Sequence, residues 1–119
     1  MFSFESLLVY QKARQLVKDV YKLQQLFPTE ERYALGDQIR RSITSVTSNI
    51  AEGSGRDSNK EKIHFLEIAF GSLMEAFSQL QNAQDLEYIS ETQVENLRPQ
   101  FEEISKMISG LKSSFEKKL

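Results

Sequence analysis

The chain has 119 residues, of which 39% are hydrophobic and 27% are charged, and it contains no cysteine. This composition is that of a single globular domain, and it excludes intrinsic disorder, disulfide bonds, thiolate catalysis and cysteine-ligated metal sites. The formal net charge of −2 gives no global attraction to nucleic acid, so binding to a polyanion would need a local basic patch.

The first half of the chain predicts two helices. Hydrophobic residues recur at steps of four and three over residues 9–27, which predicts an amphipathic helix that ends before Pro28. Thr29 is then expected to cap a second helix, because acidic residues follow it in the first turn. We expect this second helix to end at about Gly53, since the Gly-Ser-Gly sequence that begins there readily takes the left-handed conformation of a helix end.

Capping signals mark the start of two further helices. Ser58 and Glu61 match a capping box before a third helix, which carries a stripe of large apolar residues and should end near Leu86. Ser90 and Gln93 match a second capping box before a fourth helix, and a hydrophobic staple accompanies it. The connection between the third and fourth helices is therefore expected between about Leu86 and Ser90.

Pro99 is the one conflict with a regular fourth helix. The apolar spacing continues through Pro99 unbroken, so we favour a kinked or irregular first turn over a separate turn before the helix. No segment has the sustained alternation of a strand. Four helices with short connections predict an all-α fold, an antiparallel up-down-up-down four-helix bundle that forms a single domain over residues 1–119.

A row of hydrogen-bonding side chains runs along the predicted second helix. Its members recur at steps of three or four, so they lie on one side of the helix beside an apolar row. This pattern predicts a specified contact with another helix, another subunit or a ligand. We expect a polar network between helices or subunits that comprises Gln38, Arg41, Ser45, Asn49, Glu52 and Arg56, together with Ser72 of the third helix.

The predicted third helix is more apolar than one buried side requires. It carries a second row of mostly small residues, and Gly71 lies in mid-helix at a cost of about 1 kcal/mol relative to alanine. Small residues let another backbone approach closely, so we expect this row to contact another copy of the chain. The alternative is that the row serves the core of its own bundle. The row comprises Phe65, Ala69, Ser72, Ala76, Gln79 and Ala83.

Signals for catalysis and metal binding are weak. Glu61 and His64 match the Glu-x-x-His element of di-iron bundles, but those sites need two such elements and this chain has one histidine. No glycine-flanked nucleophile accompanies that histidine, which argues against a serine triad. The loop at residues 53–56 lacks the lysine and the preceding strand of a P-loop. We therefore expect no catalytic residues, no metal and no cofactor.

Basic residues gather on the first two predicted helices. Residues 1–27 carry four basic and two acidic side chains, whereas the third helix is net acidic. A symmetric ring of copies could collect the basic side chains into a surface or pore that binds phosphates without reading sequence. The alternative is ordinary solvation with pairing along each helix. The candidate nucleic-acid contacts are Arg14, Lys18, Arg40 and Arg41.

Several segments together form a recognisable pattern. They are Leu8–Ala13, Phe27-Pro28 with Glu31, Gln38–Arg41, Ser48–Gly53 with Gly55-Arg56, and Gly71–Leu73 with Glu75. On these segments the chain resembles the bacterial four-helix-bundle proteins encoded in intervening sequences of 23S ribosomal RNA genes. That family is also similar to the accessory variability protein of diversity-generating retroelements, a basic pentameric barrel. The resemblance implies an up-down bundle that assembles as a homopentamer, and it implies no known enzymatic activity.

Three hypotheses about function follow. The leading one is a non-enzymatic homo-oligomer, pentameric as the resemblance implies, whose second and third helices supply the subunit contacts. The alternative is an accessory protein that binds RNA or DNA through the basic surface of the first two helices. An enzyme with a site between subunits would rest only on Asn49, Glu52 and Arg56, and polar clusters in bundles are more often structural. We expect a cytoplasmic protein without a membrane partner, because no signal peptide or membrane span is evident.

Overall fold

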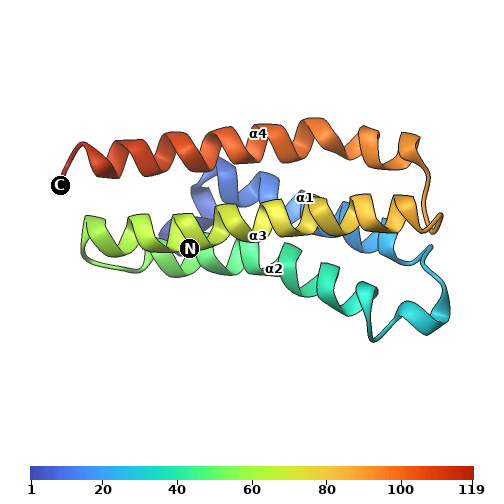
Figure 1. The fold of residues 1–119 in the computed structure, drawn as a ribbon. Helices are drawn as coiled ribbons and strands as arrows, with labels where there is room; N and C mark the ends of the chain where they lie inside the picture. Colours follow the sequence, from blue (N-terminus) through green and yellow to red (C-terminus); the bar gives the residue numbers. More distant parts are fainter.

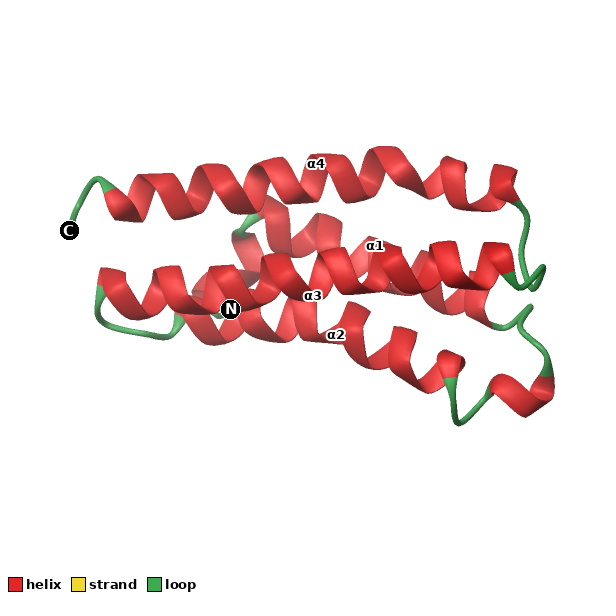
Figure 2. Cartoon of the chain, viewed as in Figure 1, coloured by secondary structure: helices red, strands yellow, loops and turns green.

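Four α-helices run along the molecule in the computed structural model, which describes residues 1–119 (Figure 1). Consecutive helices point in opposite directions, and the bundle measures 46 × 23 × 23 Å. No strand is present (Figure 2). The predicted all-α four-helix bundle is therefore confirmed. The helices are α1 (Leu8–Gln24), α2 (Leu35–Ser54), α3 (Asn59–Asp85) and α4 (Glu91–Glu116), with short 3-10 turns at Ser3–Ser6 and Thr29–Glu31.

The apolar stripes of the four helices meet in one core. Twenty buried residues form a single cluster, to which every helix contributes. Burying one large aliphatic side chain stabilises a fold by roughly 1.5–3 kcal/mol, so the alignment of these stripes is what holds the bundle together. The most completely enclosed large side chains are Leu16, Ile39, Ile43, Ile50, Leu73, Leu80, Ile104 and Ile108.

The small residues of α3 lie inside the protomer. Ala69, Ala76 and Ala83 are fully buried in the core, and they alternate with buried leucines along the helix. The prediction that these alanines contact another copy is wrong, and the alternative that they serve the core is correct. The reason is geometric: small side chains let α3 approach α2, the neighbour with which it packs most closely. The larger rings of Phe70 and Phe77 lie at the edge of the core and are only partly buried.

The start of α2 differs from the prediction. Thr29 does not cap a helix; it begins the 3-10 turn, and α2 starts only at Leu35. The residue before α2, Ala34, supplies no side-chain cap. Instead the Glu31 carboxylate accepts a hydrogen bond from the Leu35 N–H at 3.2 Å. A threonine followed by acidic residues therefore led here into a single 3-10 turn, whose own carboxylate then caps the helix.

The end of α2 falls where expected, but for a different reason. The helix stops at Ser54, and Gly55 has a φ of −86°, so no left-handed glycine closes it. Gly53 is required by packing instead. A Cβ atom at Gly53 would lie 2.9 Å from Cβ of Phe65 on α3, closer than real side chains approach. The glycine thus lets the ends of α2 and α3 meet.

Ser58 and Ser90 cap the last two helices as expected, but only Ser90 takes part in a complete capping box. The Ser58 hydroxyl accepts a hydrogen bond from the Glu61 N–H at 3.1 Å, and α3 ends at Asp85, next to the expected Leu86. Ser90 and Gln93 form both hydrogen bonds of a capping box. These local bonds fix the starts of α3 and α4.

Proline does not interrupt α4. The helix is continuous from Glu91 to Glu116 and passes through Pro99, so the expected irregular first turn is wrong, whereas a kink at Pro99 stays a prediction. Pro99 is exposed, and so is Glu95, whose carbonyl loses the N–H of residue 99 as its partner. Water can therefore replace the missing helical hydrogen bond, which is why the apolar side of α4 continues undisturbed.

Candidate functional site

The predicted polar row joins α2 to α3 at two levels. The Gln79 side-chain amide donates to Oε1 of Gln38 at 2.8 Å, and the hydroxyls of Ser45 and Ser72 lie 2.8 Å apart. The residue numbers of the two pairs add to the same total, as they must in an antiparallel helix pair with a fixed register. We call these four residues the α2–α3 polar ladder. Gln38, Ser45 and Ser72 were predicted as members of the polar network. Gln79 was assigned instead to the row of mostly small residues on α3.

Two other members of the predicted row bond mainly within α2. Asn49 donates from Nδ2 to the carbonyl oxygen of Ser45 at 2.8 Å and to its hydroxyl at 2.9 Å, so it extends the ladder by one turn. Glu52 pairs with Arg56 one turn away. The guanidinium of Arg56 also lies over the ring of Phe65 on α3, 4.8 Å from its centroid. This end of the row therefore reaches α3 through a cation–π contact.

Arg41 lies apart from the polar ladder. Its side chain is 80% exposed and pairs with Asp37 in the same helix at 2.9 Å. Of the seven predicted network residues, Gln38, Ser45, Ser72 and Arg56 thus form contacts between α2 or its end and α3, Asn49 and Glu52 bond only to the members next to them along the chain, and Arg41 lies on the surface. A contact of Arg41 with another copy of the chain stays a prediction.

Two of the predicted nucleic-acid contacts stand free on α1. Arg14 and Lys18 are exposed one helical turn apart, and neither forms an ion pair. Arg14 lies near the ring of Tyr10, with 5.9 Å between guanidinium carbon and ring centroid. Lys22 continues the same line by another turn and is likewise exposed and unpaired. We call Arg14, Lys18 and Lys22 the α1 basic ridge.

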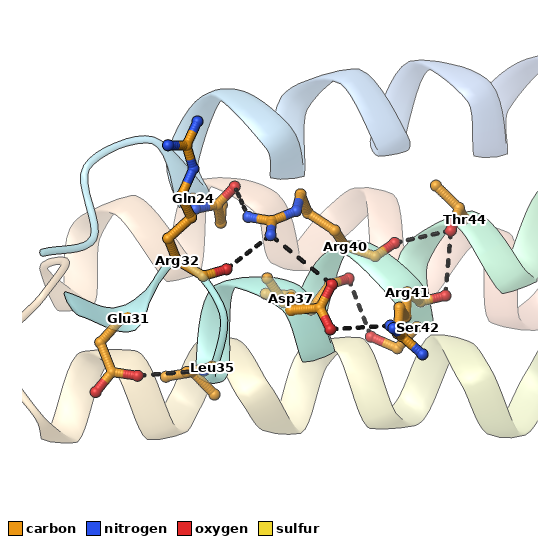
Figure 3. A network of polar contacts seen from close by, with 10 residues as sticks. Gln24, Glu31, Arg32, Leu35, Asp37, Arg40, Arg41, Ser42 and Thr44 are labelled. Atoms are coloured by element: carbon orange, nitrogen blue, oxygen red, sulfur yellow. Dashed lines mark hydrogen bonds and ion pairs between the residues drawn. The ribbon is translucent and has the colours of Figure 1, made fainter. Parts of the chain in front are cut away.

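Arg40, the fourth candidate, is tied into the protomer (Figure 3). Its side chain is only 23% exposed. It donates from Nη1 to Oε1 of Gln24 at 2.8 Å and from Nη2 to the carbonyl oxygen of Arg32 at 2.7 Å. The nearest carboxylate oxygen, on Asp37, is 3.8 Å away. Arg40 therefore joins the end of α1, the turn before α2 and the first half of α2.

A hollow of about 510 Å³ opens beside Arg40. The sequence did not indicate it, because its walls come from α1, the 3-10 turn and α2, which no spacing along the chain connects. Of its polar groups only Arg40 was predicted as a binding residue, and Gln24 and Arg32 were missed. The residues that line the hollow are Tyr21, Gln24, Gln25, Phe27, Pro28, Thr29, Arg32 and Arg40.

Shifted pKa values occur at ion pairs and hydrogen bonds on the surface. The hydrogen bond from Arg98 lowers the pKa of Glu95, and the same contact raises the pKa of Arg98. The hydroxyl of Tyr88 donates to Glu31 at 2.9 Å, and this bond to a carboxylate raises the pKa of Tyr88. Neither pair adjoins a recognisable nucleophile. Both fit structural pairing better than acid–base catalysis.

Metal binding finds no support in the arrangement of ligands. No group of three or more histidine and carboxylate side chains comes together. The single histidine, His64, is exposed and lies edge-on to Phe65, with ring centroids 5.3 Å apart. It is therefore a surface residue.

Known proteins give a consistent picture of the chain's relationships. No functionally curated protein matches it. A crystal structure from Bacteroides thetaiotaomicron, of a protein with unknown function from the S23 ribosomal protein family, superimposes with a TM-score of 0.81. It is 25% identical and covers 88% of this chain and 98% of its own. None of the helices is long and apolar enough to span a membrane. The sequence pattern of the 23S rRNA-intervening sequence protein family matches residues 5–110, so the chain belongs to that family.

Proposed function

We propose that this protein is a non-enzymatic bundle that assembles into a homo-oligomer, with five copies as the sequence resemblance implies. The contact surface would be the outer side of α3, which carries Ile68, Gly71 and Met74 at steps of three. We call these residues the α3 outer stripe. All three are exposed, with Ile68 at 37% and Met74 at 41%.

Gly71 together with its exposed apolar neighbours carries this proposal, because Gly110 of α4 is equally open but has no exposed large apolar residue beside it. A Cβ atom at this position would meet nothing within 4 Å. Packing within the protomer therefore gives no reason for a glycine, although glycine in mid-helix costs about 1 kcal/mol relative to alanine. The close approach of another backbone would supply the reason. The flanking Ile68 and Met74 would give such a contact apolar surface to bury.

The state of the polar residues supports a role without catalysis. The members of the α2–α3 polar ladder bond to one another, and no buried side-chain nitrogen or oxygen lacks a partner. Active sites, by contrast, tend to hold groups whose hydrogen bonding and pKa values are left poised for a substrate. The network thus acts as a spacer that fixes the register of α2 and α3.

Native mass spectrometry of single variants tests the assembly surface. Ile68→Lys and Met74→Lys each place a charge in the α3 outer stripe, and we expect each to shift the population from the oligomer to the 13.7 kDa protomer. Ser109→Lys is the matched control, since it adds the same charge at an exposed position of α4. The proposal fails if both stripe variants keep the wild-type oligomer, or if the wild-type chain is monomeric.

A second candidate function rests on the α1 basic ridge. Arg14 and Lys18 are exposed cations without an acidic partner, which suits contact with the phosphates of RNA or DNA. Arg41 is exposed but pairs with Asp37, whereas Arg40 is only 23% exposed and lies in the wall of the hollow rather than on the open surface of α1. The geometry therefore favours Arg14 and Lys18 over Arg40 as nucleic-acid contacts.

Filter binding over a range of salt concentrations tests this second function. Each phosphate contact should contribute about 0.9 to the slope of log K against log salt for duplex DNA. Arg14→Glu with Lys18→Glu should weaken binding and flatten the slope. A double charge reversal at Lys60 and Lys106, which are exposed on other helices, is the matched control. Absence of binding at low salt, or binding that ignores salt, would rule out phosphate contacts.

A further inference from the structure

The hollow between α1, the 3-10 turn and α2 has the chemistry of an anion site. Its lining contains two arginines and no carboxylate. The 3-10 turn carries two acids outside this lining, Glu30 and Glu31. Glu30 is exposed, and the two oxygens of Glu31 accept hydrogen bonds from the Leu35 N–H and the Tyr88 hydroxyl. In Figure 3 the Glu31 side chain points away from Arg40 and from the side chain of Arg32. A negatively charged ligand would therefore meet attraction without a competing acid in the wall.

Arg40 is a largely buried cation whose only ion pair, to Asp37, is long. Both of its hydrogen-bond acceptors, the amide oxygen of Gln24 and the carbonyl oxygen of Arg32, are neutral. Asp37 lies 3.8 Å from Arg40 but only 2.9 Å from Arg41, so its carboxylate is shared with a better-placed cation. Removing a cation from water is unfavourable unless a counter-charge compensates for it. A bound anion would provide that charge.

Arg32 offers a second guanidinium that the fold does not use. Its side chain forms no hydrogen bond and no ion pair, and it rises beside the chain that links α1 to the turn (Figure 3). Its guanidinium carbon lies 5.9 Å from the ring centroid of Tyr33. Guanidinium groups present paired donors that match the oxygens of phosphate, so Arg32 and Arg40 together suit a phosphate group.

We propose that this hollow binds an organic phosphate of nucleotide size. Arg32 and Arg40 would hold the phosphate group, while Gln24, Gln25 and Thr29 supply neutral hydrogen-bonding groups. The volume of about 510 Å³ exceeds the needs of inorganic phosphate and falls within the range of roughly 300–1,000 Å³ that small-molecule sites occupy. Tyr21 adds an aromatic side chain to the wall, on which a base can stack. The site is independent of the proposed assembly surface on α3.

Isothermal titration of the full chain with AMP tests the site, with adenosine and inorganic phosphate as comparison ligands. We expect AMP to bind at least about tenfold more tightly than either, because only AMP offers both the charge and the ring. Arg32→Glu should weaken AMP binding by about tenfold or more. Lys106→Glu, which changes the net charge equally on the surface of α4, should bind AMP like the wild type. Arg32 is the better test position than Arg40, because its side chain forms no hydrogen bond or ion pair and its one aromatic contact is with the exposed Tyr33.

Two oligonucleotides distinguish a free nucleotide from the end of an RNA chain as the source of the phosphate. If a 5′-phosphorylated RNA binds more tightly than its 5′-hydroxyl form and Arg32→Glu removes the difference, the ligand is an RNA end. Equal binding of both RNAs, with AMP binding retained, assigns the site to free nucleotides. The proposal is overturned if AMP produces no heat at millimolar concentration, if adenosine binds as tightly as AMP, or if Arg32→Glu and Lys106→Glu behave alike. Native mass spectra of both variants report assembly separately from binding.

Discussion

The α2–α3 contact and the α1–α4 contact are built from opposite kinds of side chain. Between α2 and α3 the residues are small: Gly53 admits Phe65, and two serine hydroxyls meet at 2.8 Å. Small side chains allow the two backbones to approach, and the buried alanines of α3 then complete the core. This helix pair is the best packed of the bundle.

Long polar side chains bridge α1 and α4 instead. Lys12 pairs with Glu103 at 2.9 Å, and the Gln100 side chain donates to Asp19 at 3.2 Å. Farther along the same edge, a shallow hollow of about 350 Å³ separates the two helices. Within one bundle, therefore, one contact is closely packed, whereas the other is bridged by long polar side chains beside an open hollow. Equal substitutions should consequently have unequal effects at the two contacts.

Leucine truncation should show the largest difference. Leu73 of α3 is fully buried, whereas Leu97 of α4 is partly exposed at the α1–α4 hollow. We expect Leu73→Ala to lower the free energy of unfolding by about 2–5 kcal/mol, and Leu97→Ala to lower it by less than half as much, because a wet site leaves no enclosed cavity. Urea unfolding measures both values. Equal losses would contradict the difference in packing.

Replacing one glycine tests how closely α2 and α3 must pack at their ends. Gly53→Ala forces a methyl group against Phe65, so we expect a loss of about 1–3 kcal/mol in the free energy of unfolding. Gly110→Ala is the control, because a Cβ atom there would meet nothing within 4 Å. It should stabilise α4 by up to about 1 kcal/mol through helix propensity. A gain from both substitutions would mean that α2 and α3 can separate at little cost.

Double-mutant cycles should separate the polar bonds of the two contacts. For Ser45→Ala with Ser72→Ala, we expect a coupling energy of about 0.5–1.5 kcal/mol that is insensitive to salt, because the hydroxyls are partly buried and uncharged. For Lys12→Met with Glu103→Gln, the coupling should be about 0–1 kcal/mol and should fall as salt is added, since both side chains are exposed. If the ion pair has the larger coupling energy and salt does not lower it, the α1–α4 contact is not the more solvent-accessible of the two.

Acid titration should give the smallest effect. The hydrogen bond from Arg98 lowers the pKa of Glu95 in the folded protein below its ordinary value of 4.5. The pair therefore stabilises the fold fully at pH values above 4.5. That contribution is lost as the pH falls through the lowered pKa. Glu95→Gln should therefore make the acid limb of stability less steep below pH 4.5, whereas Glu116→Gln, at a residue without an ion pair, should leave it unchanged. If stability falls equally steeply below pH 4.5 in the wild type and in both variants, the Glu95–Arg98 pair does not contribute to it.

Local signals were enough to predict most of the fold. Helix periodicity and the capping residues Ser58 and Ser90 depend on neighbours within four residues, so the chain itself carries them. The start of α2 could not be predicted in the same way. A threonine followed by acidic residues can begin either a 3-10 turn or an α-helix, and the outcome depends on Glu31 reaching both Leu35 and the distant Tyr88.

The candidate sites also differ in whether spacing along one helix was enough to predict them. The polar ladder was predictable from the steps of three and four in α2, and the antiparallel register would have paired Gln38 with Gln79 as well. The small row on α3 was misassigned, because small residues indicate close packing without saying whether the partner helix belongs to the same chain. The hollow beside Arg40 was not predictable, because three elements build it and no spacing links Gln24 to Arg32.

Sedimentation equilibrium of the wild-type chain at micromolar concentration tests the proposed assembly most directly. If the α3 outer stripe docks copies of the chain, the measured mass should lie near five times the 13.7 kDa of one protomer. A single species of 13.7 kDa would contradict the account, because Gly71 and its two apolar neighbours would then face only water.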